Sequence, residues 1–535
     1  MEVPDELVVT AGRVRVIGEL PNDTDGGAPP SAPVVSTGAL VARNAILNLA
    51  SQGLPLIVGL VTLPRVINGL GAARYGVLTL AWTLLGYLSV FDFGLSRATT
   101  KFVAELTARG DTESVPRIAW TTIAMQCALG SIGGVLLALF ARPLAYHILN
   151  VPADLAPEAE SCFLVLALAV PIVLLSNSLR GLLEAAQRFD LVNAVRAPSN
   201  TLYYLLPFAG VLLKVSLPSI LMAFVVSWII GVIVQLQMCG RVYPAFLRRP
   251  QFIRREARRL LHFGGWATVS GLISPMLVYA DRVIIGSLLT VAAVSYYAAP
   301  FDMVTRLLVI PSSLVGTLFP ALSALSGAEG DRTMARLLAR TSKFLLLVLG
   351  PIILVLVIFA HPLLRLWLGA SFAEKSSLPL RLLAVGVLSN ALAQIPFSLA
   401  QARGRPDIPA RFHLVELPIH IVAIAVGVRY WGIAGAAAAW SARVTLDCVL
   451  LYGAAMRLSA ATWEDFRTDR LPSVVAILAV AGAAMSLGRV EAVPMPMRIG
   501  AVVLGATAGI GSLWVFALSQ PERTALLRIG RRSNS

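Results

Sequence analysis

The feature that most constrains this chain is a series of about fourteen apolar segments, mostly 17 to 25 residues long, between Ala39 and Leu518. An α-helix needs roughly 20 apolar residues to cross the ~30 Å hydrocarbon core of a bilayer. Charged residues make up only 14% of the chain and the mean hydropathy is +0.77, whereas a soluble domain carries about 25% charged residues. The sequence therefore predicts an all-α polytopic membrane protein.

The eighth of these segments differs from the others, because it is long and contains Pro300 and Pro311. Proline removes a backbone donor, so we expect this span to be kinked. The fourteen expected spans lie at residues 41–63, 76–96, 118–141, 162–183, 197–214, 217–239, 263–286, 291–320, 342–360, 378–400, 411–428, 432–455, 471–488 and 498–518.

A short signature recurs at one fixed offset along these segments. The residues RVING at 65–69 close the first segment, and RVIIG at 282–286 closes the seventh, 217 positions later. The same offset separates the RFD motif at 188–190 from the RPD motif at 405–407, after the fourth and tenth segments. Two matches at one ungapped offset indicate a duplicated unit of six spans, and an even number of spans gives both copies the same orientation. We therefore expect two parallel six-helix lobes around a central cavity, plus a C-terminal helix pair.

The composition between the segments suggests the domain boundaries. Residues 1–38 are acidic and rich in Pro and Gly, which predicts a disordered cytoplasmic tail. Arginines and apolar residues alternate at roughly helical spacing in 241–262, which predicts a basic amphipathic cytoplasmic linker. This linker could lie on an anionic leaflet or gather phosphorylated lipid headgroups. The remaining expected parts are the N-lobe at 39–240, the C-lobe at 263–460, the C-terminal helix pair at 461–518 and a basic cytoplasmic tail at 519–535.

The net charge of +15 reflects membrane topology and does not indicate nucleic-acid binding. With the N-terminus inside, the inward-facing loops and C-terminal tail hold 28 of the 44 Lys and Arg residues, and the outward loops hold 10. This is the positive-inside pattern, so both termini are expected in the cytoplasm. The four cysteines form no CxxC pair and are expected to be apolar packing residues.

No motif of a soluble enzyme is present. The sequence contains neither a GxxxxGK[ST] phosphate loop nor an HExxH pair, and its five histidines are scattered. The outward loops, at most about 20 residues long, leave no room for a catalytic domain. We expect a transporter and not an enzyme, working as a monomer without cofactor or metal.

Charged residues within the spans are the candidate site. Each costs roughly 2.5–3.5 kcal/mol at the bilayer centre, so most should face a hydrated cavity or a partner. The pairs Asp302–Arg306 and Arg443–Asp447 have i,i+4 spacing, which puts each pair on one helical face. The pairs could simply neutralise each other, or the arginines could exchange a carboxylate for a substrate phosphate, which their planar fork binds well. The intramembrane charges are Asp281, Arg282, Asp302, Arg306, Glu416, Arg443 and Asp447.

The first half of the chain carries fewer charges. A polar stripe of Arg43, Asn44, Asn48 and Gln52 runs along the first span and should face a cavity or another helix. Asp92 ends the second span, and Arg180 with Glu184 forms another i,i+4 pair at the end of the fourth.

Several short motifs resemble those of bacterial polysaccharide flippases of the multidrug/oligosaccharidyl-lipid/polysaccharide exporter superfamily. They are RNAILN at 43–48, LG-x-x-x-YG at 70–76, DFGL at 92–95, Y-x-DR-x-I-x-G at 279–286, YY-x-A at 296–299 and IPS at 310–312. The resemblance covers most of 39–518 and implies two six-helix lobes that move an undecaprenyl-pyrophosphate-linked oligosaccharide outward by alternating access. It further implies an inner-membrane protein serving capsule, exopolysaccharide or O-antigen-like export, with membrane lipids, and polysaccharide polymerase and glycosyltransferases as candidate partners.

Three other functions are alternatives to that of a polysaccharide flippase. Many such flippases have twelve spans, and the additional pair is similar to that of the lipid II flippase of peptidoglycan synthesis, which is therefore an alternative. A multidrug cation exporter should have a cavity dominated by unpaired carboxylates. A membrane glycosyltransferase or polymerase should have a sizeable outward loop. We predict substrate contacts from Arg306, Arg443, Arg282, Arg43 and Asn48, and charge-partner or ion-coupling roles for Asp302, Asp447, Asp281, Glu416 and Asp92.

Overall fold

The structure, a computed structural model, describes residues 38–247, 251–325, 327–486, 495–520 and 523–524. This part of the chain is almost entirely helical and contains no strand. Its helices are α1 Gly38–Leu88, α2 Leu95–Ala108, α3 Val115–Pro143, α4 Ala156–Ala185, α5 Phe189–Leu212, α6 Leu217–Val242, α7 Arg254–Leu288, α8 Val291–Thr305, α9 Val309–Ala324, α10 Gly327–Ile358, α11 Ala360–Leu368, α12 Ala370–Ala402, α13 Asp407–Ser459, α14 Trp463–Thr468, α15 Leu471–Ser486 and α16 Met495–Ser512.

The expected spans run through these helices. Two of the helices, α1 and α13, each contain two spans that meet at a sharp turn, at Gly71 (φ 79°) and Gly432 (φ 58°). Within the described residues, eight helices are long and apolar enough to cross a membrane, and α15 is a shorter apolar helix. The polytopic helical fold is confirmed, and the count of fourteen crossings stays a prediction.

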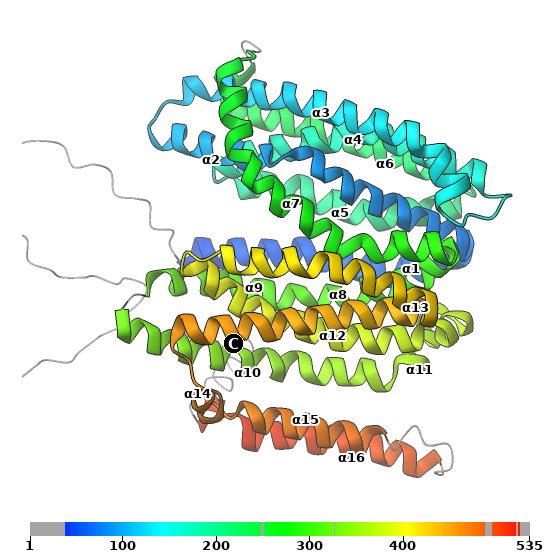
Figure 1. Ribbon diagram of the computed structural model, residues 1–535, viewed down its shortest axis with the longest axis vertical. Helices are drawn as coiled ribbons and strands as arrows, with labels where there is room; N and C mark the ends of the chain where they lie inside the picture. The colour runs from blue at the N-terminus through cyan, green and yellow to red at the C-terminus, as the bar shows by residue number, and fades with distance from the viewer. Residues whose placement is uncertain (1–37, 248–250, 326, 487–494, 521–522, 525–535) are drawn as a thin grey trace, which may run out of the picture.

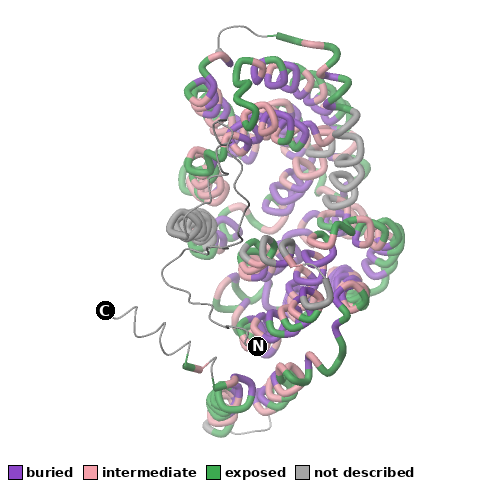
Figure 2. The backbone as a smooth tube through the Cα atoms, turned by 90° about the vertical axis from the view of Figure 1, so that its left-hand side faces the viewer, coloured by how far each residue is buried: buried purple, intermediate pink, exposed green. Residues whose placement is uncertain are grey.

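The helices form two groups that lie against each other (Figure 1). Helices α2 to α6 belong to the upper group in that view, and α8 to α13 belong to the lower group. Most buried positions lie inside these two groups (Figure 2). The helix pair α15 and α16 lies at the far end and packs against α10, where Gly350 contacts Leu478 of α15.

Helix α7 connects the two groups. Near its start, the buried Leu260 joins a cluster with Phe102 of α2, and Arg259 approaches Glu105 of α2 to 3.7 Å. Its other end packs against α8 and α13. Since α7 begins at Arg254, the second half of the expected linker is helical and continuous with the seventh span. The domain boundaries themselves stay predictions, and both terminal tails lie almost wholly outside the described residues.

The internal repeat is visible in the geometry of two loops. Arg188 binds Asp190 through two hydrogen bonds of 3.0 and 2.8 Å before α5, and Arg405 binds Asp407 through two of 2.9 and 3.2 Å before α13. In each pair the arginine hydrogen bonds hold the pKa of the aspartate below its usual value.

The residues that precede these pairs match as well. Gln187 (φ 58°) and Gly404 (φ 68°) both adopt the left-handed conformation, and they are separated by the same offset as the motifs. The duplicated sequence therefore folds into duplicated structure.

The two groups of helices meet tightly at one end, at the right of Figure 1, which we call the closed end. A Cβ atom at Gly76 would lie only 1.8 Å from the carbonyl oxygen of Val291, so nothing larger than glycine fits there without a shift of backbone. The side-chain amide of Asn150 donates to the carbonyls of Ser287 (2.7 Å) and Leu289 (2.9 Å). Ser295 donates to the carbonyl of residue 72.

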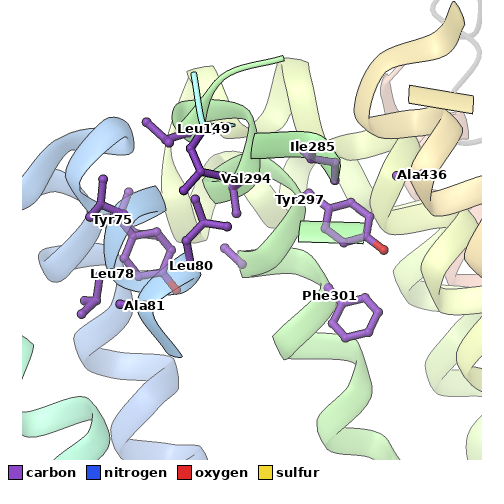
Figure 3. Close-up of a cluster of buried hydrophobic side chains, with 14 of the residues drawn as sticks. Tyr75, Leu78, Leu80, Ala81, Leu149, Ile285, Val294, Tyr297, Phe301 and Ala436 are labelled. Atoms are coloured by element: carbon purple, nitrogen blue, oxygen red, sulfur yellow. The ribbon is translucent and has the colours of Figure 1, made fainter. Parts of the chain in front are cut away.

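Buried apolar side chains complete the closed end. Leu80 of α1, Leu149 of the α3–α4 loop and Val294 of α8 point toward one another (Figure 3). This core joins the two groups at the closed end.

Candidate functional site

A cavity of about 600 Å³ lies between the two groups of helices. Its first wall, from α1, α5 and α6, is largely aromatic and includes Trp82, Tyr203 and Trp228. Its second wall, from α7, α8, α12 and α13, carries three arginines, one carboxylate and one amide. These polar residues are Arg282, Arg306, Arg443, Asp302 and Asn390. The three arginines predicted from the sequence therefore share one cavity.

Arg282 is the most deeply buried of the three, with 4% of its surface exposed. Its guanidinium lies 2.5 Å from a carboxylate oxygen of Asp302 and stacks near the rings of Tyr279 (5.7 Å) and Phe301 (5.4 Å). This bond holds the cation at the cavity wall when nothing else is bound.

Asp281 is buried behind that wall, with 1% of its surface exposed. It accepts hydrogen bonds from the hydroxyl of Tyr297 and from the backbone N–H of Arg282. It does not line the cavity, so its contacts are those of a positioning residue.

Arg306 lies beside the aromatic wall. It contacts the hydroxyl of Tyr204 on α5, and its guanidinium lies 5.5 Å from that ring. Among the described residues, no carboxylate lies within ion-pair distance of Arg306. Its positive charge is thus available to an anion in the cavity.

The expected pairing of Asp302 with Arg306 is wrong, because Asp302 binds Arg282 instead. The reason lies in the helix itself. Pro311 has no N–H to bond the carbonyl of Leu307, and a 3-10 turn at Arg306–Leu308 separates α8 from α9. Arg306, at the first residue of this turn, contacts Tyr204 of α5 instead. The expected kink is present at this turn.

Arg443 pairs with Glu416 across the Gly432 turn, at 3.3 Å. Glu416 is 3% exposed. Asp447, which we expected to bind Arg443, lies 3.7 Å from the imidazole of His413 instead. The i,i+4 spacing placed both partners on one face, but a residue on the facing half of α13 lies closer. By contrast, the expected pair of Arg180 and Glu184 forms, at 3.5 Å.

The aromatic wall was not found from the sequence. The rings of Trp82 and Tyr203 stack with centroids 4.0 Å apart, and Phe224 stacks on Trp228 at 5.7 Å. The buried indole nitrogen of Trp82 has no hydrogen-bond partner among the described residues. These aromatics come from three helices with no common spacing, so only the fold brings them together.

A second cavity of about 340 Å³ adjoins the first and shares Trp82, Tyr203, Asp302 and Arg306 with it. Apolar side chains form most of its remaining wall, among them Leu60, Leu63 and Val66 of α1 and Trp367 of α11. The arginine-bearing cavity is therefore flanked by an apolar one.

Three other predicted site residues are not placed in the cavity. The side chains of Arg43 and Asn48 lie outside the described part of the structure. Asp92 ends a 3-10 turn before α2 and accepts hydrogen bonds from Ser96 and Gln126. It organises the start of α2 and does not line the cavity.

Two lobes of membrane helices around a cavity define a polytopic transporter. The chain belongs to the polysaccharide biosynthesis protein family, whose model matches residues 41–326. The MatE family model matches residues 267–426. These matches confirm the family that the short motifs indicated.

Individual relatives agree. A candidate O-antigen transporter of Shigella flexneri is 28% identical over 411 residues, which cover 77% of this chain and 96% of that protein. The fold is similar to that of the lipid II flippase MurJ in an inward closed conformation (TM-score 0.68, 13% identity, 89% of this chain and 98% of that chain). It is also similar to an inward-facing multidrug resistance MATE family transporter of the MOP superfamily (TM-score 0.64, 15% identity, 78% and 98%).

At these identities the structural matches show the fold alone. The Shigella flexneri relative and these two solved structures are named as transporters or a flippase and not as enzymes, in agreement with the expectation from the sequence.

Proposed function

We propose that this protein is a flippase that moves undecaprenyl-pyrophosphate-linked oligosaccharide from the inner to the outer leaflet of the bacterial inner membrane. The observation that carries this proposal is the cavity with three arginines on one wall and stacked aromatic rings on the other. Guanidinium groups bind phosphate oxygens in a bidentate way. Aromatic rings offer flat apolar surface, and their polar tips can bond sugar hydroxyls.

Different parts of the site suit different chemical parts of such a substrate. Arg306 supplies an unpaired cation for the pyrophosphate, while Arg282 and Arg443 can join by leaving Asp302 and Glu416. The sugars face Trp82 and its neighbours on the opposite wall. The adjoining apolar cavity receives the first part of the polyprenyl chain.

Transport then proceeds by alternating access. With both termini in the cytoplasm, as the charge bias of the loops predicts, the closed end faces the outer side of the membrane and seals the cavity from that side. Loading from the inner leaflet is followed by rocking of the lobes, which opens the closed end and releases the substrate outward.

Lipid II flipping remains the nearest alternative, since lipid II also joins a sugar to a polyprenyl pyrophosphate. Export of drug cations is disfavoured by the cavity itself. Asp302 is the only acidic side chain among the described lining residues of the cavity, and it is occupied by Arg282.

Deletion of the gene in its host tests the proposal. The expected result is loss of surface polysaccharide together with accumulation of the lipid-linked oligosaccharide on the inner leaflet. Surface labelling of the glycan measures the first, and lipid extraction measures the second. Unchanged surface polysaccharide with accumulated lipid II would support the alternative. Increased retention of ethidium with normal polysaccharide would support a cation exporter.

A further inference from the structure

A cluster of titratable side chains lies next to the substrate cavity, within the second lobe. His413 and Glu416 lie one turn apart on the first half of α13, and Asp447 faces them from the second half. One imidazole nitrogen of His413 and one carboxylate oxygen from each of Glu416 and Asp447 all lie within 4.8 Å of one another. A cavity of about 220 Å³ opens beside them, lined by His413, Asp447 and Arg443 among others.

Two carboxylate oxygens in this cluster lack a donor. Glu416 and Asp447 are 3% and 9% exposed. The Oε1 atom of Glu416 and the Oδ1 atom of Asp447 have no hydrogen-bond partner among the described residues. Burying a charged oxygen without a donor is costly. The cluster is therefore built for a ligand that brings positive charge.

The charges around the cluster indicate which ligand this is. Glu416 and Asp447 carry two negative charges and Arg443 one positive charge, so with a neutral imidazole the sum is −1 and a single proton balances it. The helices packed around the cluster contribute little that could take the place of this proton. Helix α12 contributes the neutral amides of Asn390 and Gln394, and α7 contributes Leu277 and Val278 with Asp281 beyond. His420 and Cys448 are the other titratable neighbours on α13.

His413 is well placed to hold that proton. Its Nε2 atom lies 3.7 Å from the partnerless Oδ1 of Asp447, and its ring stacks on Phe397 with an interplanar angle of 17°. Imidazole is the side chain whose charge changes near neutral pH. A metal cation is a poorer match, since the guanidinium of Arg443 already lies against Glu416.

Arg443 connects this cluster to the substrate. It lines both the central cavity and the smaller one, and its guanidinium is the cationic partner of Glu416. An anion in the central cavity that draws Arg443 away leaves both carboxylates uncompensated, which favours proton binding at the cluster. Linkage requires that each binding event strengthen the other.

We propose that His413 and Asp447, with Glu416, form a proton-binding site that is coupled through Arg443 to pyrophosphate binding in the central cavity. This inference rests on the proposed function. Its role is charge compensation: when Arg443 turns to the substrate, Glu416 and Asp447 are left with two negative charges, and the proton reduces this to one.

Calorimetry on the full-length protein in lipid nanodiscs tests the coupling, with farnesyl pyrophosphate as the probe. Titrations near pH 7 in two buffers of different ionisation enthalpy give the number of protons taken up per probe bound. We expect uptake in the wild type to exceed that in His413→Gln and Asp447→Asn by up to about one proton. His361→Gln, a change at an exposed position of α11, serves as the matched control and should behave as the wild type. Equal uptake in all four proteins would overturn the proposal, as would probe binding that follows the sodium concentration at fixed pH.

A second measurement does not depend on the probe. In ¹⁵N-histidine spectra of the full chain, with His413 assigned by its loss in His413→Gln, the wild type should show the protonated imidazole at mildly acidic pH. Asp447→Asn should show it neutral at the same pH. Identical His413 spectra in the two proteins would overturn the proton site. Failure of the probe to bind the wild type, with the spectral difference present, would instead overturn the assigned substrate.

Discussion

The three cavity arginines are not equivalent, although they look alike in the sequence. Arg306 has an exposed guanidinium against Tyr204, whereas Arg443 compensates the buried Glu416. Removing one partner of a buried ion pair leaves the other charge bare, which costs about 3–5 kcal/mol. Substitution should therefore affect function at the first position and folding at the second.

We predict that Arg306→Gln reduces polymer export and leaves the melting temperature of the purified protein nearly unchanged. Arg306→Lys should recover export only in part, because lysine keeps the charge and loses the planar fork. Export is read from surface polysaccharide, and stability from fluorescence-detected size exclusion after heating. Normal export in Arg306→Gln would show that this arginine does not bind the substrate.

Arg443→Gln should lower the melting temperature markedly, since Glu416 would remain buried without its cation. The double variant Arg443→Gln/Glu416→Gln should recover most of the stability and none of the export. A stable single variant would contradict the ion pair, and an exporting double variant would make the pair purely structural.

The arginine pairings mark the point at which reasoning from the sequence fails. Insertion cost pointed to seven intramembrane charges, and the three arginines among them line one cavity. Spacing along one helix did not select their partners, because a closer group on a facing helix competes with the i+4 neighbour. The pair of Arg180 and Glu184 did form, at half-exposed positions.

Conformational strain at one loop gives a further prediction. Gln187 adopts the left-handed conformation that Gly404 adopts in the other half. Gln187→Gly should remove about 1–2 kcal/mol of strain, offset by about 0.4–1 kcal/mol of added entropy in the unfolded chain. We expect a small rise in melting temperature, and a fall for Gly404→Gln as the reverse change. The opposite order would contradict the equivalence of the two loops.

At the scale of elements, the contact between α1 and α8 determines whether the two groups of helices can seal the closed end. A side chain at Gly76 would collide with the backbone oxygen of Val291, which cannot move away as a flexible side chain could. The repeat motifs predicted that these helices belong to different lobes. They could not predict this contact, because it depends on how the two lobes pack.

We predict that Gly76→Leu holds the closed end open and lowers export. In a background without the four native cysteines, Thr83→Cys in the cavity should then react with a membrane-impermeant maleimide added outside the cell. Gly453→Leu is the matched control, as a Cβ there meets nothing within 4 Å. Equal labelling of Thr83→Cys with and without Gly76→Leu would contradict the assigned role.

At the scale of the whole molecule, the orientation in the membrane stays a prediction from the charge bias of the loops. Composition and the length of the apolar segments were sufficient for the fold class, because membrane insertion requires apolar helices. The two lobes followed from the repeated motifs. The tilt of the lobes and the aromatic wall were not accessible, since they arise from contacts between residues far apart in the chain.

Both termini should be cytoplasmic. In the cysteine-free background, single cysteines at Ser36 and Ser533 should be protected from an impermeant maleimide in intact cells and labelled after permeabilisation. Labelling of only one of them from outside would require an odd number of crossings and would contradict the fourteen-span topology.

The bond between Arg282 and Asp302 has a consequence for the unloaded protein. After the glycan has left, the lobes must return to the inward-open state without substrate. A guanidinium without a counter-charge would make that step slow. Asp302 lies 2.5 Å from Arg282, so the chain supplies its own counter-charge for the return step. Resetting then requires no exchanged anion at Arg282. Arg306, which has no carboxylate partner among the described residues, is the cavity arginine at which phosphate on the outer side should act.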